Sequence, residues 1–99
     1  MDKYQKLKNE YKEIYQQVTN ILQKHDPVGI IFDDNADEYD PELSTILPKL
    51  KHCKSEREVL ELVHQAFVKW FSESIAGPRT RYEQIAKEIW EIWSRHVAE

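Results

Sequence analysis

The sequence predicts an all-α fold, a four-helix antiparallel bundle with a long acidic loop between its first and second helices. Two observations predict it. Apolar residues recur at steps of three and four in four separate stretches of the chain, which places them on one face of each stretch. Glycine and proline are rare, at two and four residues, which suits long helices with short connections. Because amphipathic helices bury their apolar faces against one another, four of them are expected to pack as a bundle.

The first helix is expected over residues 3–25. Its apolar residues share one face because they recur at helical spacing, while lysine, glutamate and glutamine fill the opposite face. They are Tyr4, Leu7, Tyr11, Ile14, Tyr15, Val18, Ile21 and Leu22. The helix is expected to end near His25, because Pro27 disfavours helical backbone angles at the residue before it.

A proline start signal predicts the second helix at about residues 41–53. Asp40 is a good N-cap residue and Pro41 suits the first helical position, so together they mark a helix start. Pro48 lies inside the following apolar pattern and removes a backbone donor, so we expect a kink there. The pattern consists of Leu43, Ile46, Leu47, Leu50 and Cys53.

Two capping boxes predict the third and fourth helices. In a capping box, a serine or threonine and a glutamate three residues later bind the exposed N–H groups at a helix start. Ser55 and Glu58 form the first box, and the glycine–proline pair at 77–78 ends the helical pattern that follows. Thr80 and Glu83 form the second box, ahead of the last apolar stripe.

The length and composition indicate one domain over residues 1–99. The chain is 40% hydrophobic and has 11% aromatic residues, which is enough for one packed core. Its net charge is −4, and an acidic chain is a poor general ligand for nucleic acid because phosphate contacts need lysine and arginine. Its single cysteine excludes an internal disulfide. No apolar run is long enough to cross a membrane, and no signal peptide is recognisable, so a cytoplasmic location is expected.

The acidity is concentrated between residues 26 and 42, a stretch without lysine or arginine. It contains Asp26, Asp33, Asp34, Asp37, Glu38, Asp40 and Glu42. The apolar run 28–32 is expected to hold this connection against the helices, and the carboxylates after it are expected to face water. A connection of this length is often functional or packed on itself. We therefore expect a protein partner with a basic surface, since opposite charges speed association and set specificity.

The expected contacts with that partner are a short set of residues in this connection. Its acidic members are Asp33, Asp34, Asp37 and Glu38, and Tyr39 is expected to serve as the less polar anchor. Trp90 is a second candidate, because it lies off the centre of the last apolar stripe. If exposed, it would anchor a partner or a second copy of the chain, since tryptophan is frequent at binding hot spots. A homodimeric structural protein is thus the alternative.

A weak cation site is a further alternative, and a catalytic site has less support. Asp33, Asn35 and Asp37 match the opening of a helix–loop–helix calcium site, but the sixth and twelfth positions hold Glu38 and Ser44 instead of glycine and glutamate. The four histidines are not spaced as ligand pairs on a helix. No nucleophile, base and oxyanion donor can be assembled from the pattern, so no enzyme, cofactor or dedicated metal is expected.

Several short motifs resemble one known family. They are Asp26-Pro27-Val28-Gly29, the acidic Asp37-Glu38-Tyr39-Asp40-Pro41-Glu42, Ile46-Leu47-Pro48 and Phe67-Val68-Lys69-Trp70-Phe71. Together they resemble the short bacillus-type YugE-like proteins, a domain of unknown function, over nearly the whole chain. The resemblance implies a small bacterial helical bundle without an established activity, cofactor or partner. Related acidic loops occur in small immunity or accessory proteins, which makes such a role the runner-up.

Overall fold

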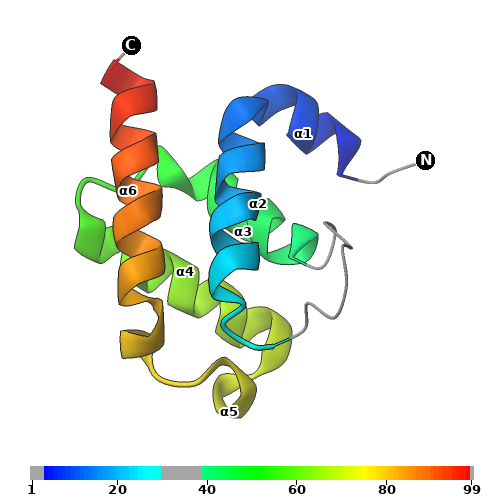
Figure 1. The fold of residues 1–99 in the computed structure, drawn as a ribbon, viewed down its shortest axis with the longest axis vertical. Coiled ribbons are helices and arrows are strands. Elements are labelled where there is room, and N and C mark those ends of the chain that lie inside the picture. The colour runs from blue at the N-terminus through cyan, green and yellow to red at the C-terminus, as the bar shows by residue number, and fades with distance from the viewer. Residues whose placement is uncertain (1–3, 30–38, 99) are drawn as a thin grey trace.

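The computed structural model describes residues 4–29 and 39–98, and these residues form helices without a strand (Figure 1). The all-α class is therefore confirmed. In chain order the elements are α1 (Gln5–Tyr11), α2 (Glu13–His25), α3 (Asp40–Leu50), α4 (Glu56–Phe71), α5 (Glu73–Ala76), the 3-10 turn η1 (Arg79–Tyr82) and α6 (Glu83–Ala98). Within these residues, no helix is long and apolar enough to span a lipid bilayer.

The four longer helices pack as two antiparallel pairs that cross each other (Figure 1). One pair is α2 and α6, which run in opposite directions along the long axis of the view, and the other is α3 and α4, which run across it. The molecule measures 37 × 34 × 20 Å, and its shortest extent fits two layers of helices about 8–10 Å apart. The expected antiparallel bundle is not confirmed, because α3 and α4 lie across the other pair instead of along it.

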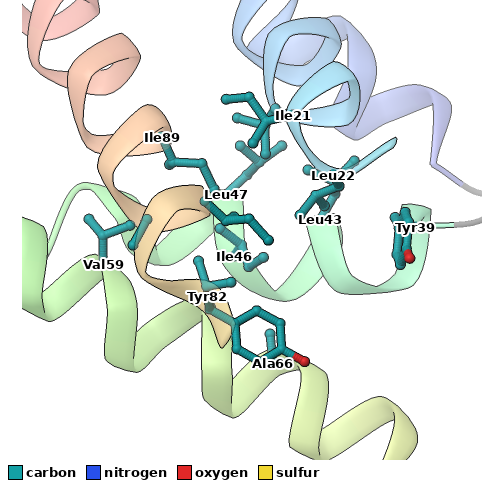
Figure 2. Close-up of a cluster of buried hydrophobic side chains, with 14 of the residues drawn as sticks. Ile21, Leu22, Tyr39, Leu43, Ile46, Leu47, Val59, Ala66, Tyr82 and Ile89 are labelled. Atoms are coloured by element: carbon teal, nitrogen blue, oxygen red, sulfur yellow. The ribbon is translucent and has the colours of Figure 1, made fainter. Parts of the chain in front are cut away.

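The core lies where the two pairs cross. Figure 2 shows side chains of α2, α3, α4 and α6 converging there, with Leu47 and Ile46 of α3 at the centre. The fully buried positions follow the apolar stripes of the sequence and include Val18, Leu22, Leu43, Ile46, Leu47, Leu50, Val59, Val63, Phe67, Tyr82, Ile85 and Ile89. Burial of these stripes is the main stabilising contribution to the fold.

The predicted first helix is broken at Lys12. This residue has φ 50° and ψ −116°, and it separates α1 from α2, so the prediction of one continuous helix over residues 3–25 is wrong. The end of α2 is as expected: the chain leaves the helix at Asp26, which adopts the left-handed conformation, and Pro27 follows. α1 has no buried residue, whereas α2 buries its stripe between α3 and α6.

The helices of the second pair begin as predicted and end earlier. α3 starts at Asp40 and contains Pro48, but it ends at Leu50 instead of residue 53. The first capping box is confirmed, because the Glu58 N–H donates to Ser55 Oγ at 3.3 Å. Glu58 also reaches back, although its carboxylate accepts from the N–H of the residue before the serine, Lys54, at 2.8 Å. α4 then ends at Phe71.

The connection from α4 to α6 contains two extra helical turns that the sequence did not predict. Ser72 has φ 98° and directs the chain into α5, so the chain leaves α4 before the glycine at position 77. Gly77 has φ 80°, and a Cβ there would lie 2.5 Å from Cζ of Arg81. Thr80 lies inside η1 instead of capping α6, so the second capping box is not formed as expected.

Candidate partner-binding site

Four of the predicted contact residues, Asp33, Asp34, Asp37 and Glu38, lie outside the described residues. The residues on either side of them are described, and they form the base from which the acidic segment, residues 30–38, departs. One side is the end of α2 with Asp26, Pro27 and Val28. The other side is Tyr39 and the first turn of α3. Val28 packs against the core, as expected for the apolar part of this connection.

A hydrogen bond closes this base. The Tyr39 hydroxyl donates to Asp26 Oδ1 at 2.5 Å, so the two ends of the connection are joined directly across 13 positions of sequence. Burial, together with the hydrogen bond to Asp26, raises the pKa of the Tyr39 hydroxyl well above its ordinary value, so the group stays a donor.

Tyr39 itself is not on the surface. Its side chain is 1% exposed, and its ring centroid lies 5.6 Å from that of Phe67 on α4. Figure 2 shows it at the start of α3, beside the buried cluster. The prediction that Tyr39 contacts a partner as an anchor therefore disagrees with its burial. Its apolar ring fills the core, while its hydroxyl bonds to Asp26 at the end of α2.

Arg81 of η1 binds the same base. One nitrogen of its guanidinium lies 3.1 Å from the carbonyl oxygen of Pro27, and also within hydrogen-bond distance of the carbonyls of Ile75 and Ala76. The end of α2 is thereby tied to the connection between α4 and α6. Arg81 thus reaches the connection between α2 and α3 through the carbonyl oxygen of Pro27. Arg79 instead forms an ion pair with Glu61 of α4.

Asp40, at the far end of the connection, is buried and structural. Its side chain is 3% exposed; Oδ1 accepts from the Tyr15 hydroxyl at 2.5 Å, and Oδ2 lies 3.6 Å from Nζ of Lys8. It thus links α1, α2 and the start of α3. The expectation that all carboxylates of the stretch face water is therefore wrong for Asp40, because a tyrosine and a lysine from other helices surround it.

Glu42 is the second buried carboxyl group of α3. It is 1% exposed, and its Oε2 has no hydrogen-bond partner among the described residues. Burial, with the nearby charge of Asp40, raises its pKa to about 7, although a backbone N–H opposes the shift. Near neutral pH, Glu42 is thus a mixture of protonated and ionised forms instead of a solvated carboxylate. This burial was not predictable from the sequence, since glutamate is common in the exposed first turn of a helix.

The exposed tryptophan is Trp70, and Trp90 is half-buried against the core. Trp70 is 43% exposed, and its Nε1 donates to Thr45 Oγ1 of α3 at 2.9 Å. It lies beside a groove of about 430 Å³ lined also by Tyr4, Leu7 and Ser44. The sequence pointed to Trp90 because Trp70 fits the apolar stripe of α4. Trp70 is the last but one residue of α4 and stays partly exposed although it fits this stripe.

No group of three or more histidine, cysteine, aspartate or glutamate side chains in residues 4–29 and 39–98 could hold a metal ion. Two of the histidines make contacts between elements. His25, the last residue of α2, bonds to Glu88 of α6 at 2.7 Å, and His64 bonds to the carbonyl of Gly77 at 3.0 Å. The calcium-like motif that begins at Asp33 lies in the part of the chain that is not described.

The chain matches no protein-family model, no curated protein and no solved structure. The resemblance to the YugE-like family therefore stays a prediction.

Proposed function

We propose that this chain is a non-enzymatic cytoplasmic protein-binding module, whose acidic segment recognises a partner protein with a basic surface. The contacts are assigned to Asp33, Asp34, Asp37 and Glu38, which lie between α2 and α3 in the sequence. Tyr39 takes a different role from the one expected of it: it holds the base of the segment in place.

The observation that supports this proposal best is the closed base. The bond between Tyr39 and Asp26 joins the two ends of the connection, and Arg81 binds the carbonyl of Pro27 next to it. Fixing both ends of a segment lowers the conformational entropy that remains to be lost on binding. A binding segment with fixed ends therefore loses less conformational entropy on binding than the same residues in an open linker, and its affinity is higher.

The charges favour the same function. The stretch from residue 26 to residue 42 has neither lysine nor arginine, and four of its seven carboxyl groups belong to the acidic segment. Arg81 reaches this stretch, but the oxygen it binds there belongs to a carbonyl. Lys8 lies next to Asp40, at the edge of the stretch. A one-signed cluster attracts a basic surface over roughly a Debye length, about 8–10 Å at physiological salt.

The test replaces the four carboxylates by their amides, as Asp33→Asn, Asp34→Asn, Asp37→Asn and Glu38→Gln in one chain. Wild type and variant are each immobilised, and proteins captured from an extract of the source cells are identified by mass spectrometry. A matched control removes the same number of charges from exposed positions on other elements, as Glu13→Gln, Glu73→Gln, Glu83→Gln and Glu91→Gln.

We expect wild type and control to capture the same partner and the acidic-segment variant to lose it, with an unchanged circular dichroism spectrum. Capture should also weaken as salt is added, because screening shortens the reach of the charges. Equal capture by all three proteins would contradict the proposal. A melting temperature that rises with added calcium in wild type, but not in the variant, would instead favour the cation-binding alternative.

A further inference from the structure

The bend at Lys12 interrupts a helix that the sequence would otherwise continue. The apolar stripe of α1 stays in phase with that of α2, and the break contains neither glycine nor proline. Lysine is a good helix former, yet Lys12 has φ 50° and ψ −116°. A residue with a Cβ in this region is strained by about 1–3 kcal/mol. Straightening Lys12 would relieve that strain and join α1 and α2 into one helix.

α1 is also less buried than the four longer helices. None of its residues is buried, and its apolar side chains Leu7 and Tyr11 are half-buried against the core. The open groove of about 430 Å³ beside Trp70 lies along it, lined by Leu7 and Glu10 of α1 and by Ser44 of α3. Figure 1 shows α1 projecting from the top of α2, away from α6.

The surface that α1 covers includes a buried tyrosine and a buried carboxylate. Tyr15 and Asp40 are 5% and 2% exposed, and Lys8 of α1 approaches both of them. Without α1, a carboxylate would lose its cation and apolar side chains would meet water, and both changes destabilise a protein. The segment that fits this surface in the structure is α1 itself. A second copy of this chain carries the same segment.

We propose that α1 is an exchangeable arm through which two copies of this chain form a dimer. In the dimer Lys12 is helical, and the α1 of each copy lies on the Tyr15–Asp40 surface of the other copy, beside Trp70. The exchange is reciprocal, so it closes with two-fold symmetry. This dimer differs from the one expected at Trp90, because it uses the opposite end of the sequence.

The backbone strain at Lys12, the hinge between α1 and α2, sets the balance between monomer and dimer. The contacts of α1 with its surface are the same in monomer and dimer, so they cancel. Association costs translational and rotational freedom, which favours the monomer, while each dimer relieves the strain of two hinges. A substitution at Lys12 that changes only the strain should therefore change the dimer dissociation constant.

Two variants separate these effects with matched loss of charge. Lys12→Gly removes the strain of the bend and weakens a continuous helix, so it should favour the monomer. Lys12→Val makes the bend more costly, because a branched Cβ tolerates positive φ poorly, so it should favour the dimer. Their dissociation constants, measured by light scattering over a concentration series, are expected to differ by roughly tenfold or more.

A mixing experiment tests whether the arms are exchanged. Lys8→Asp and Asp40→Lys each place like charges between arm and surface, so neither variant alone should dimerise well. Mixed together, they should form heterodimers in native mass spectra, because each arm then meets an opposite charge. Equal dissociation constants for the two Lys12 variants, or no dimer of Lys12→Val at any concentration, would overturn the proposal. Heterodimers of the two charge variants no more abundant than random pairing predicts would also overturn the proposal.

Discussion

Burial changes the chemistry of individual carboxyl groups in this chain, and Glu42 is the clearest case. Its pKa is raised from 4.5 to about 7, so its ionised form is disfavoured in the folded state. The sign follows directly: the folded state binds the proton more tightly, and the fold loses stability as pH rises from about 4.5 through about 7.

We therefore expect Glu42→Gln to stabilise the fold at about pH 8 and to make its free energy of unfolding less dependent on pH. The linkage of pKa to stability limits the gain in the free energy of unfolding to at most about 3 kcal/mol. Urea unfolding at about pH 4.5 and about pH 8 measures this. Glu91→Gln, at an exposed position of α6, is the control and should change little. A variant as pH-sensitive as wild type would show that the Glu42 carboxyl is not the group responsible.

At the scale of elements, Glu88 joins α2 to α6. Its Oε1 accepts from Lys24 Nζ at 2.5 Å, and its Oε2 contacts His25 Nε2 at 2.7 Å and accepts from Gln84 Nε2 at 3.2 Å. Burial alone would raise its pKa, but these partners outweigh burial and lower it to about 2. The stability contribution is thus present above pH 4.5 and is lost as pH falls towards about 2.

Glu88→Gln should accordingly destabilise the fold at neutral pH by about 1 kcal/mol, since Lys24 is well exposed and the pair is screened. The difference from wild type should shrink as pH falls below 4.5, where the native carboxylate begins to lose its advantage. Thermal melts of both proteins at neutral pH and below pH 4.5 measure this difference in stability. A difference that does not depend on pH would mean that Glu88 stabilises the contact between α2 and α6 through packing instead of charge.

The sequence predicted most helices because their burial follows a regular stripe, but it could not predict contacts between distant elements. The start of α4 was predictable since Ser55 and Glu58 are local partners. The break at Lys12 was not, because nothing nearby in the sequence disfavours a helix there. Tyr39 was misjudged for a similar reason: its neighbours in sequence are acidic, whereas its neighbours in space are Asp26 and Phe67.

At the scale of the whole molecule, the crossed pairs bring the base of the acidic segment to one place. The end of α2, the start of α3 and the α5–α6 connection meet there, through the bonds of Tyr39 and Arg81. The acidic segment itself is known from the sequence alone, whereas the residues on either side of it are described by the structure. The central claim is therefore that the closed base is what makes the carboxylates of residues 33–38 an effective binding surface.

Tyr39→Phe tests this claim most directly, because it keeps the buried ring and every carboxylate and removes the hydroxyl that bonds to Asp26. The matched control is Tyr11→Phe, on the half-buried face of α1. The measurement is the affinity of each protein for the partner captured by wild type. We expect Tyr39→Phe to bind roughly tenfold more weakly, since an open base leaves more entropy to lose on binding, with Tyr11→Phe unchanged. Wild-type affinity in a correctly folded Tyr39→Phe would contradict the account.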